Sequence, residues 1–197
     1  MNLPNDFWYF SGALNDEQCN KILSLKQKNE FKKAVVGEKE QVLKSKRSSN
    51  IFWTSEPFIY KCIEPYVEFA NKEAGWNFDF DAAEAAQFTE YGKGGYFHWH
   101  KDAFSRPWNK PDSPFIHGKI RKLSVTVTLT DPEKYEGGNL EFVQPYPDKE
   151  NKIFTKEEFR KKGSIIVFPS SVWHRITPIT KGTRNSLVIW WLGLPFR

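Results

Sequence analysis

The spacing of apolar residues changes its period near residue 76 of this chain. Before that point, two segments place apolar residues every three or four positions, the period of a helix that buries one face. The first predicted helix begins after Asn15, a capping residue that is followed by two acidic residues. The second runs from about Pro57 to Glu73, and we expect Pro65 inside it to cause a kink or to mark a restart.

Beyond residue 76, apolar and polar residues alternate with the period of a strand. A short apolar strand is also expected at residues 5–10, and exposed strands and loop at 31–50. Many short strands in a row predict a sandwich or barrel. The predicted fold is mainly β with supporting α-helices, a double-stranded β-helix (jelly roll) with N-terminal helices packed on it. Its main strands are expected at residues 78–90, 96–102, 121–130, 139–144, 164–168, 172–177 and 184–192.

Two irregular stretches interrupt these strands. Residues 103–119 hold three prolines and form a long loop, which makes them a candidate lid. Residues 146–162 are charged and are expected to be an exposed excursion with one helical turn. The length of 197 residues favours a single domain, with residues 1–77 as helical support and 78–197 as the jelly-roll core.

Composition and charge indicate the cellular compartment of the protein more than its function. A net charge of +5 would suit an anionic ligand or a nucleic acid, but the excess is small and spread along the chain. Cys19 and Cys62 form no CxxC pair, which favours a reducing compartment. The N-terminus has no signal-peptide pattern, and no stretch is apolar enough to span a membrane. We therefore expect a cytoplasmic protein without membrane contact.

Residues 91–102, YGKGGYFHWHKD, end in candidate metal ligands. His100 and Asp102 are two residues apart, so in a strand they point to the same face. His98 shares this face, but it would lie about 13 Å from Asp102 along the strand at about 3.3 Å per residue. The metal pair is thus either His98 with His100, as in the HxH motif of cupins, or His100 with Asp102. A cupin also has a glutamate four or five residues later; this chain lacks it, which favours the second pair.

A second group of candidates lies in the last quarter of the sequence. His174 begins a predicted strand, and Arg184 and Ser186 share one face of the next strand. Two histidines and one carboxylate on one side of a metal are typical of non-haem Fe(II) oxygenases. A guanidinium binds a carboxylate through two parallel hydrogen bonds, and a neighbouring hydroxyl adds a third. Because a buried arginine needs an anion, an inward Arg184 predicts an acidic ligand.

Three motifs carry a family resemblance. The pattern Y-x-x-G-x-x-[YF]-x-x-H-x-D is matched by Tyr91, Gly94, Phe97, His100 and Asp102. The turn YEGGNLEF at 135–142 is similar to the family's glycine pair before a core strand, and HRITPITKGTRNS at 174–186 to its distal segment. On these motifs residues 78–197 resemble the Fe(II)/2-oxoglutarate-dependent dioxygenases, in their prolyl 4-hydroxylase-like branch. Position 97 is Phe where many members have Tyr, which removes one hydroxyl.

The resemblance implies a set of catalytic and co-substrate residues. His100, Asp102 and His174 would bind iron, while Arg184 and Ser186 would hold the C5 carboxylate of 2-oxoglutarate. Tyr91 would add a hydrogen bond to this co-substrate. Dioxygen completes the reactants, and ascorbate is an optional addition. Decarboxylation of 2-oxoglutarate to succinate and CO2 would then be coupled to hydroxylation of a peptidyl residue, with proline as the leading candidate.

The resemblance leaves the primary substrate open. Tentative substrate contacts are Trp190 and, in the candidate lid, Arg106 and Trp108. The expected partner is a protein or peptide that contains proline, and the oligomeric state is not predicted. One alternative is a nucleic-acid oxidative demethylase, but such relatives usually carry a second arginine where Trp190 stands. Another is a cupin-like metal- or sugar-binding module without oxygenase activity, against which Arg184 argues.

Overall fold

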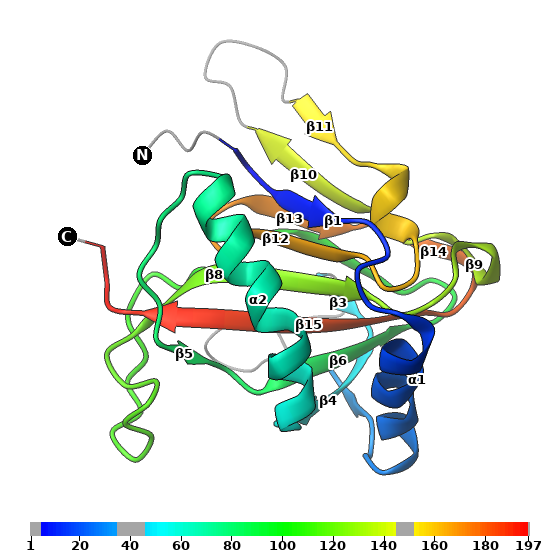
Figure 1. The fold of residues 1–197 in the computed structure, drawn as a ribbon. Coiled ribbons are helices and arrows are strands. Elements are labelled where there is room, and N and C mark those ends of the chain that lie inside the picture. The colour runs from blue at the N-terminus through cyan, green and yellow to red at the C-terminus, as the bar shows by residue number, and fades with distance from the viewer. Residues whose placement is uncertain (1–4, 35–45, 145–151, 197) are drawn as a thin grey trace.

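Two facing β-sheets form the body of the protein in the computed structural model, which describes residues 5–34, 46–144 and 152–196 (Figure 1). The larger sheet has eight strands in the order β1-β12-β8-β15-β6-β4-β2, and β5 pairs with β15 beside β6. All neighbours in it are antiparallel. Its strands are β1 (Trp8–Phe10), β2 (Lys32–Lys33), β4 (Asn50–Thr54), β5 (Ala82–Ala83), β6 (Ala86–Tyr91), β8 (Ile120–Thr128), β12 (Ile165–Pro169) and β15 (Arg184–Gly193).

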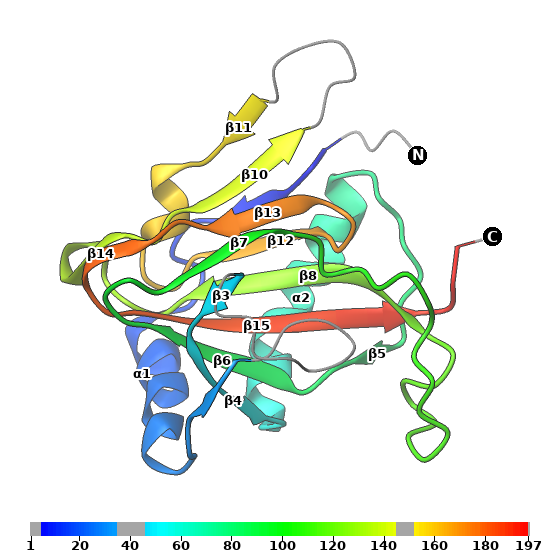
Figure 2. The same ribbon diagram turned by 180° about the vertical axis from the view of Figure 1, so that it is seen from behind.

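The smaller sheet has five strands in the order β11-β10-β13-β7-β3. These are β3 (Arg47–Ser48), β7 (Tyr96–His100), β10 (Leu140–Gln144), β11 (Lys152–Phe154) and β13 (Trp173–Ile176). A two-stranded sheet joins β9 (Tyr135–Gly137) to β14 (Ile179–Gly182). Figure 2 shows the smaller sheet lying across the face of the larger sheet that is turned away from the helices. The predicted jelly roll is confirmed.

Two helices cover the other face of the larger sheet (Figure 1). Helix α1 (Asp16–Ser24) begins with a complete capping box, in which Asn15 and Gln18 exchange hydrogen bonds, and η1 (Leu25–Gln27) continues it. Helix α2 (Pro57–Glu73) is one element that contains Pro65, so the chain does not restart there. Two further 3₁₀ turns are η2 (Pro132–Lys134) and η3 (Glu157–Arg160). Among the described residues, no helix has the length and apolar character needed to cross a membrane.

Successive side chains of the central strands point to opposite faces of the larger sheet, and both faces are buried. Toward the helices, β6, β8 and β15 present Phe88, Val125 and Leu187 to a single large apolar cluster. Toward the smaller sheet, the same strands present residues that are buried yet mostly polar. These are Gln87, Thr89, Tyr91, Ser124, Thr126, Thr128, Arg184, Ser186 and Trp190. Buried polar side chains are unusual unless something pairs with them, so this inner face is where a ligand is expected.

The main difference from the predicted strands lies at 78–90. This strand is split into β5 and β6, because the three residues between Ala83 and Gln87 lie opposite the two between Val188 and Trp191, a β-bulge. Before residue 78, β1 lies within the strand expected at 5–10, and β3 and the start of β4 lie within the segment 31–50 where strands were expected; they pair with β12, β7 and β6. Within 146–162, residues 146–151 lie outside the described residues; η3 supplies the expected helical turn, but its Phe159 is buried and not exposed.

Candidate metal centre

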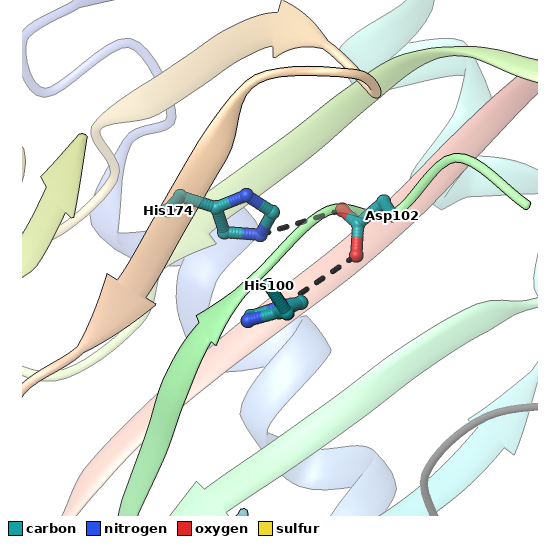
Figure 3. Close-up of side chains that lie close together, drawn as sticks. All are labelled: His100, Asp102 and His174. Atoms are coloured by element: carbon teal, nitrogen blue, oxygen red, sulfur yellow. Dashed lines mark ion pairs between the residues drawn. The ribbon is translucent and has the colours of Figure 1, made fainter. Parts of the chain in front are cut away.

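Three side chains that could ligate a metal converge between the two sheets (Figure 3). His100 ends β7, His174 lies on β13, and the two are directly paired across these antiparallel strands. Asp102 follows β7 by two residues, and its backbone is fixed because the amides of Asp102 and Ala103 both donate to the carbonyl of Ser170, at 3.0 and 2.8 Å. One ligand atom from each of the three side chains lies within 4.8 Å of the others.

The orientation of both imidazoles suits metal binding. Nδ1 of His100 lies 2.7 Å from the carbonyl of His98, and Nδ1 of His174 lies 3.0 Å from that of Val172. A carbonyl can only accept, so each Nδ1 carries the proton and each Nε2 keeps a free lone pair. Both Nε2 atoms lie 3.6 Å from an oxygen of Asp102. These separations leave room for an ion between the groups, and a backbone bond to Nδ1 is the usual support of a ligating histidine.

The electrostatics keep His100 and Asp102 in the protonation states that bind a metal at neutral pH. Burial lowers the pKa of His100 to about 3, with a further contribution from His174 and a small one from Arg47. Burial by itself would raise the pKa of Asp102, but His174, His100 and Arg121 outweigh it and hold that pKa at about 2. The site therefore offers an ionised carboxylate from Asp102 and a neutral imidazole from His100. Ligands of these types form a two-histidine, one-carboxylate Fe(II) site.

Aromatic rings exclude water from the ligands. Phe97 stacks on His100 with ring centroids 3.5 Å apart, and Phe168 meets His174 edge-on at 4.6 Å. The indole N–H of Trp190 is buried without a full hydrogen bond among the described residues, yet it lies close enough to Asp102 to lower the pKa of that carboxyl. A dry shell of this kind strengthens the electrostatic interactions inside it.

Arg184 and Ser186 lie on the inner face of β15, as predicted. Both are almost fully buried, and Nη1 of Arg184 donates to Oγ of Ser186 at 3.2 Å. No carboxylate of the described residues lies within ion-pair distance of Arg184. Tyr91, its partner on β6, has its ring centre 5.8 Å from the guanidinium carbon. A buried guanidinium with a hydroxyl beside it and no anion fits one carboxylate of a dicarboxylic acid.

The glycine pair before β10 makes room for this arginine. A Cβ atom on Gly138 would lie 2.3 Å from Cδ1 of Ile179 and 3.1 Å from Cδ of Arg184. Its φ of +63° is also in the left-handed region that favours glycine. Gly138 is thus required both for the turn and for the position of the Arg184 side chain.

The other sequence candidates divide into buried and exposed residues. Trp190 is buried on the inner face, and Trp108 in the candidate lid donates its indole N–H to Oε1 of Glu84 at 3.1 Å. Arg106 is exposed on that loop. His98 and His117 are also exposed, and neither belongs to the group of three ligands. The preference for His100 with Asp102 over His98 with His100 therefore agrees with the structure.

Two charged residues at the site were not predicted from the sequence. Arg121 forms a bidentate ion pair with Glu84, at 2.7 and 2.6 Å, and its guanidinium carbon lies 3.8 Å from the ring centre of Trp190. A third charged residue, Arg47, was expected on the surface within the segment 31–50, but it is buried on the inner face of the smaller sheet.

Comparisons with known proteins agree with this geometry. The family model of the 2OG-Fe(II) oxygenase superfamily matches residues 86–192, more than half of the chain. A PKHD-type hydroxylase of Acidovorax ebreus is 34% identical over 105 residues, which cover 53% of this chain and 41% of the relative. A PKHD-type hydroxylase of Klebsiella pneumoniae is 31% identical over 111 residues, covering 54% and 42%. The chain thus spans about two-fifths of the length of these curated relatives.

Solved structures share the fold across nearly the whole chain. A prolyl-4-hydroxylase of Pseudomonas putida superposes with a TM-score of 0.67 at 17% identity, covering 94% of this chain and 91% of that protein. A prolyl hydroxylase of Trichoplax adhaerens, in complex with a hypoxia-inducible-factor peptide fragment, gives 0.71 at 17% identity, covering 95% and 83%. At this identity the likeness concerns the fold alone. With the family model, the jelly roll and the three converging ligands in agreement, the chain belongs to the 2OG-Fe(II) oxygenase superfamily.

Proposed function

We propose that this protein is an Fe(II)- and 2-oxoglutarate-dependent dioxygenase that hydroxylates a peptidyl residue, with proline as the first candidate. The observation that carries the proposal is the convergence of His100, Asp102 and His174 on one point, within 4.8 Å of one another, with both imidazole Nε2 atoms turned inward. Arg184 on the opposing inner face supports it, because this buried guanidinium has no carboxylate partner in the described part of the chain. Residues 1–197 are proposed to act as one domain.

The residues of this chain have separate tasks in the proposed reaction. His100, Asp102 and His174 would hold the iron, and their backbone partners keep both lone pairs directed at it. Arg184, Ser186 and Tyr91 would hold and orient the far carboxylate of 2-oxoglutarate. Dioxygen would supply the oxidising equivalents, 2-oxoglutarate would be oxidised to succinate and CO2, and the bound iron would bring these two reactants together. The protein's contribution is placement of the reactants and exclusion of water.

Three residues are proposed to contact the primary substrate. Trp190 is next to Asp102, and Trp108 and Arg106 lie on the loop that follows it. The similar structures from Pseudomonas putida and Trichoplax adhaerens are named as prolyl hydroxylases, the second with a peptide bound. Those names support peptidyl proline as the first substrate class to test.

The experiment combines co-substrate turnover with product mass. Purified protein is incubated with Fe(II), 2-oxoglutarate and a library of proline-containing peptides; succinate is measured and peptides are searched for a gain of about 16 Da, the mass of one oxygen atom. The proposal expects succinate that depends on iron, falls to background in His174→Ala, and rises with an accepted peptide. Tight metal binding without any 2-oxoglutarate turnover would instead support a metal-binding module.

A further inference from the structure

Arg47 is a second buried guanidinium at the site, and the reaction proposed above gives it no role. Only 7% of its surface is exposed. Its Nε donates to Oγ of Ser49 at 2.8 Å, and its Nη2 to Oε1 of Gln87 at 2.8 Å and Oγ1 of Thr89 at 3.5 Å. All three acceptors are neutral oxygens. Within the described residues, no carboxylate lies within ion-pair distance of Arg47, and its Nη1 donates no hydrogen bond.

A buried positive charge in this state is costly for the protein. Neutral hydroxyl and amide oxygens satisfy hydrogen bonds but do not compensate a full charge. Arg121 shows the contrast, because it is paired with Glu84 through two short bonds. Arg47 and Arg184 are both buried and both donate hydrogen bonds to neutral side chains, and neither has an anion among the residues that the structure describes. The same property that marks Arg184 as an anion-binding residue therefore marks Arg47.

The position of Arg47 relates it to both halves of the site. Strand β3 pairs with β7, and Arg47 is the direct partner of Phe97. The guanidinium carbon lies 4.6 Å from the centre of the Phe97 ring, which in turn stacks on the metal ligand His100. On the opposite sheet, Thr89 and Ser186 are paired residues of neighbouring strands. Arg47 donates a hydrogen bond to Thr89 and Arg184 donates one to Ser186, so both arginines contact this pair.

The two carboxylates of 2-oxoglutarate already have places in the proposed function. One would meet Arg184 and Ser186, and the other would lie at the metal. Arg47 contacts neither place directly. Its guanidinium packs on the Phe97 ring, and it is this ring that contacts the metal ligand His100. An anion bound at Arg47 would then be a third anionic group, and the molecule that is oxidised is its remaining source.

We propose that Arg47 binds a carboxylate of the primary substrate, close to the carbon that is hydroxylated. This inference rests on the proposed oxygenase function. Two sources have the same chemistry: the α-carboxylate of a free amino acid, and an acidic side chain next to the target residue in a peptide. Arg47 would form two charge-assisted hydrogen bonds to it, while Ser49 and Gln87 keep the guanidinium in place.

The test uses two matched pairs of probes with the iron-loaded protein. The first pair is L-proline and L-prolinamide, and the second is an acetylated, amidated Ala-Pro-Glu peptide and its Ala-Pro-Gln counterpart. Binding is measured by ligand-observed NMR with Zn(II) in place of iron, and turnover by probe-stimulated succinate. In at least one pair the wild-type protein should prefer the carboxylate at least tenfold, and the pair that shows it identifies the source.

Variants of Arg47 separate this role from the others. Arg47→Gln should abolish the preference, Arg47→Lys should retain part of it, and both should bind 2-oxoglutarate within about twofold of wild type. Lys33→Gln removes one exposed positive charge near β4 and should change nothing. Thermal unfolding verifies that each variant is folded, and Arg47→Lys covers the case in which Arg47→Gln is not.

Two results would overturn the proposal. The first is a wild-type protein that binds both members of each pair equally or binds none of them. The second is an Arg47→Gln variant that loses 2-oxoglutarate affinity as strongly as Arg184→Gln does, which would assign Arg47 to the co-substrate. Failure of the oxygenase function itself has a different signature, since wild-type protein would then show no binding of 2-oxoglutarate at all.

Discussion

His100 and His174 face each other across the paired strands β7 and β13, with ring centroids 4.1 Å apart. Each ring is fixed by a bond from its Nδ1 to the carbonyl two residues earlier in the chain. The two imidazoles are therefore held in place before any metal arrives, and their positions follow from the pairing of β7 with β13.

Removal of any one ligand should abolish tight metal binding. His100→Ala, Asp102→Asn and His174→Ala each leave only two of the three groups that converge within 4.8 Å. We expect Mn(II) affinity, measured by calorimetry, to fall at least a hundredfold in each. His98→Ala and His117→Ala are matched controls, because both histidines are exposed and lie outside the ligand group. An unchanged affinity in Asp102→Asn would contradict this assignment.

Arg184→Gln should weaken 2-oxoglutarate binding strongly. Loss of one partner of a buried charged pair costs about 2–5 kcal/mol, which corresponds to roughly thirtyfold or more in the dissociation constant. Ser186→Ala removes one neutral hydrogen-bonding group and should cost several-fold. The thermal stabilisation produced by added 2-oxoglutarate, which depends on the dissociation constant, reports both effects.

Without co-substrate, replacement of Arg184 by an apolar residue should not destabilise the protein. Arg184 is a buried charge with no anion among the described residues, so Arg184→Met is expected to leave the ligand-free protein as stable as wild type or more stable. A melting temperature that falls by many degrees in ligand-free Arg184→Met would show that the guanidinium has a compensating partner.

Gly138→Ala should affect 2-oxoglutarate binding through Arg184. The new Cβ would press on Cδ of Arg184 and on Ile179, and the φ of +63° adds backbone strain. Gly94→Ala is a matched control, since its φ is +76° but a Cβ added there would have open space for 4 Å around it. Both variants should lose stability, but only Gly138→Ala should raise the dissociation constant for 2-oxoglutarate. Equal constants in the two variants would remove Gly138 from the co-substrate site.

The ion pair of Arg121 with Glu84 should contribute to stability far more than a surface pair does. Its side chains are 9% and 10% exposed, so Arg121→Met leaves a buried, unpaired carboxylate, with an expected loss of about 3–5 kcal/mol in urea unfolding. The exposed pair of Lys134 with Asp131 is the control, and Lys134→Met should cost less than about 1 kcal/mol. Similar losses in the two variants would show that the Glu84 site is open to water.

Burial raises the pKa of the Cys19 thiol to about 11, from 9.0 in an unfolded chain. Since the folded pKa is the higher one, this group stabilises the fold fully below pH 9, and that contribution is lost as the pH rises from 9 toward 11. Melting temperature should therefore fall more steeply over that window in wild type than in Cys19→Ser. In the folded protein iodoacetamide should label Cys62 and spare Cys19, whereas labelling of both in the unfolded protein is the control.

The sequence was most informative where one strand face is buried in apolar neighbours. Strand β8 shows the two-residue period clearly, β12 is a continuous apolar run, and Arg184 begins β15. His100 ends β7, Asp102 follows that strand by two residues, and His174 lies in β13. Strands β2 and β3 have two residues each, too few to show any period. The spacing of the ligands within a motif was therefore readable, whereas contributions from short strands were not.

Charged pairs between distant strands were the main omission. Glu84 follows two alanines at the bulge between β5 and β6, and its partner Arg121 is 37 residues away, so nothing local to either residue reveals the pair. Arg47 follows Lys44 and Lys46 in a basic stretch that suggests an exposed segment, and its burial depends on the pairing of β3 with β7. Both cases are properties of strand register, which a single sequence does not encode locally.

Strand β15 is made last among the described strands, yet it lies in the middle of the larger sheet between β6 and β8. During synthesis, β6 and β8 must wait with unpaired edges until residues 184–193 leave the ribosome, because neither can pair with the other in its place. Such long-range closure slows folding and leaves strand edges open to other nascent chains. We therefore expect the yield of folded protein in cells to depend on chaperone capacity, more strongly than the stability of the folded protein alone would suggest.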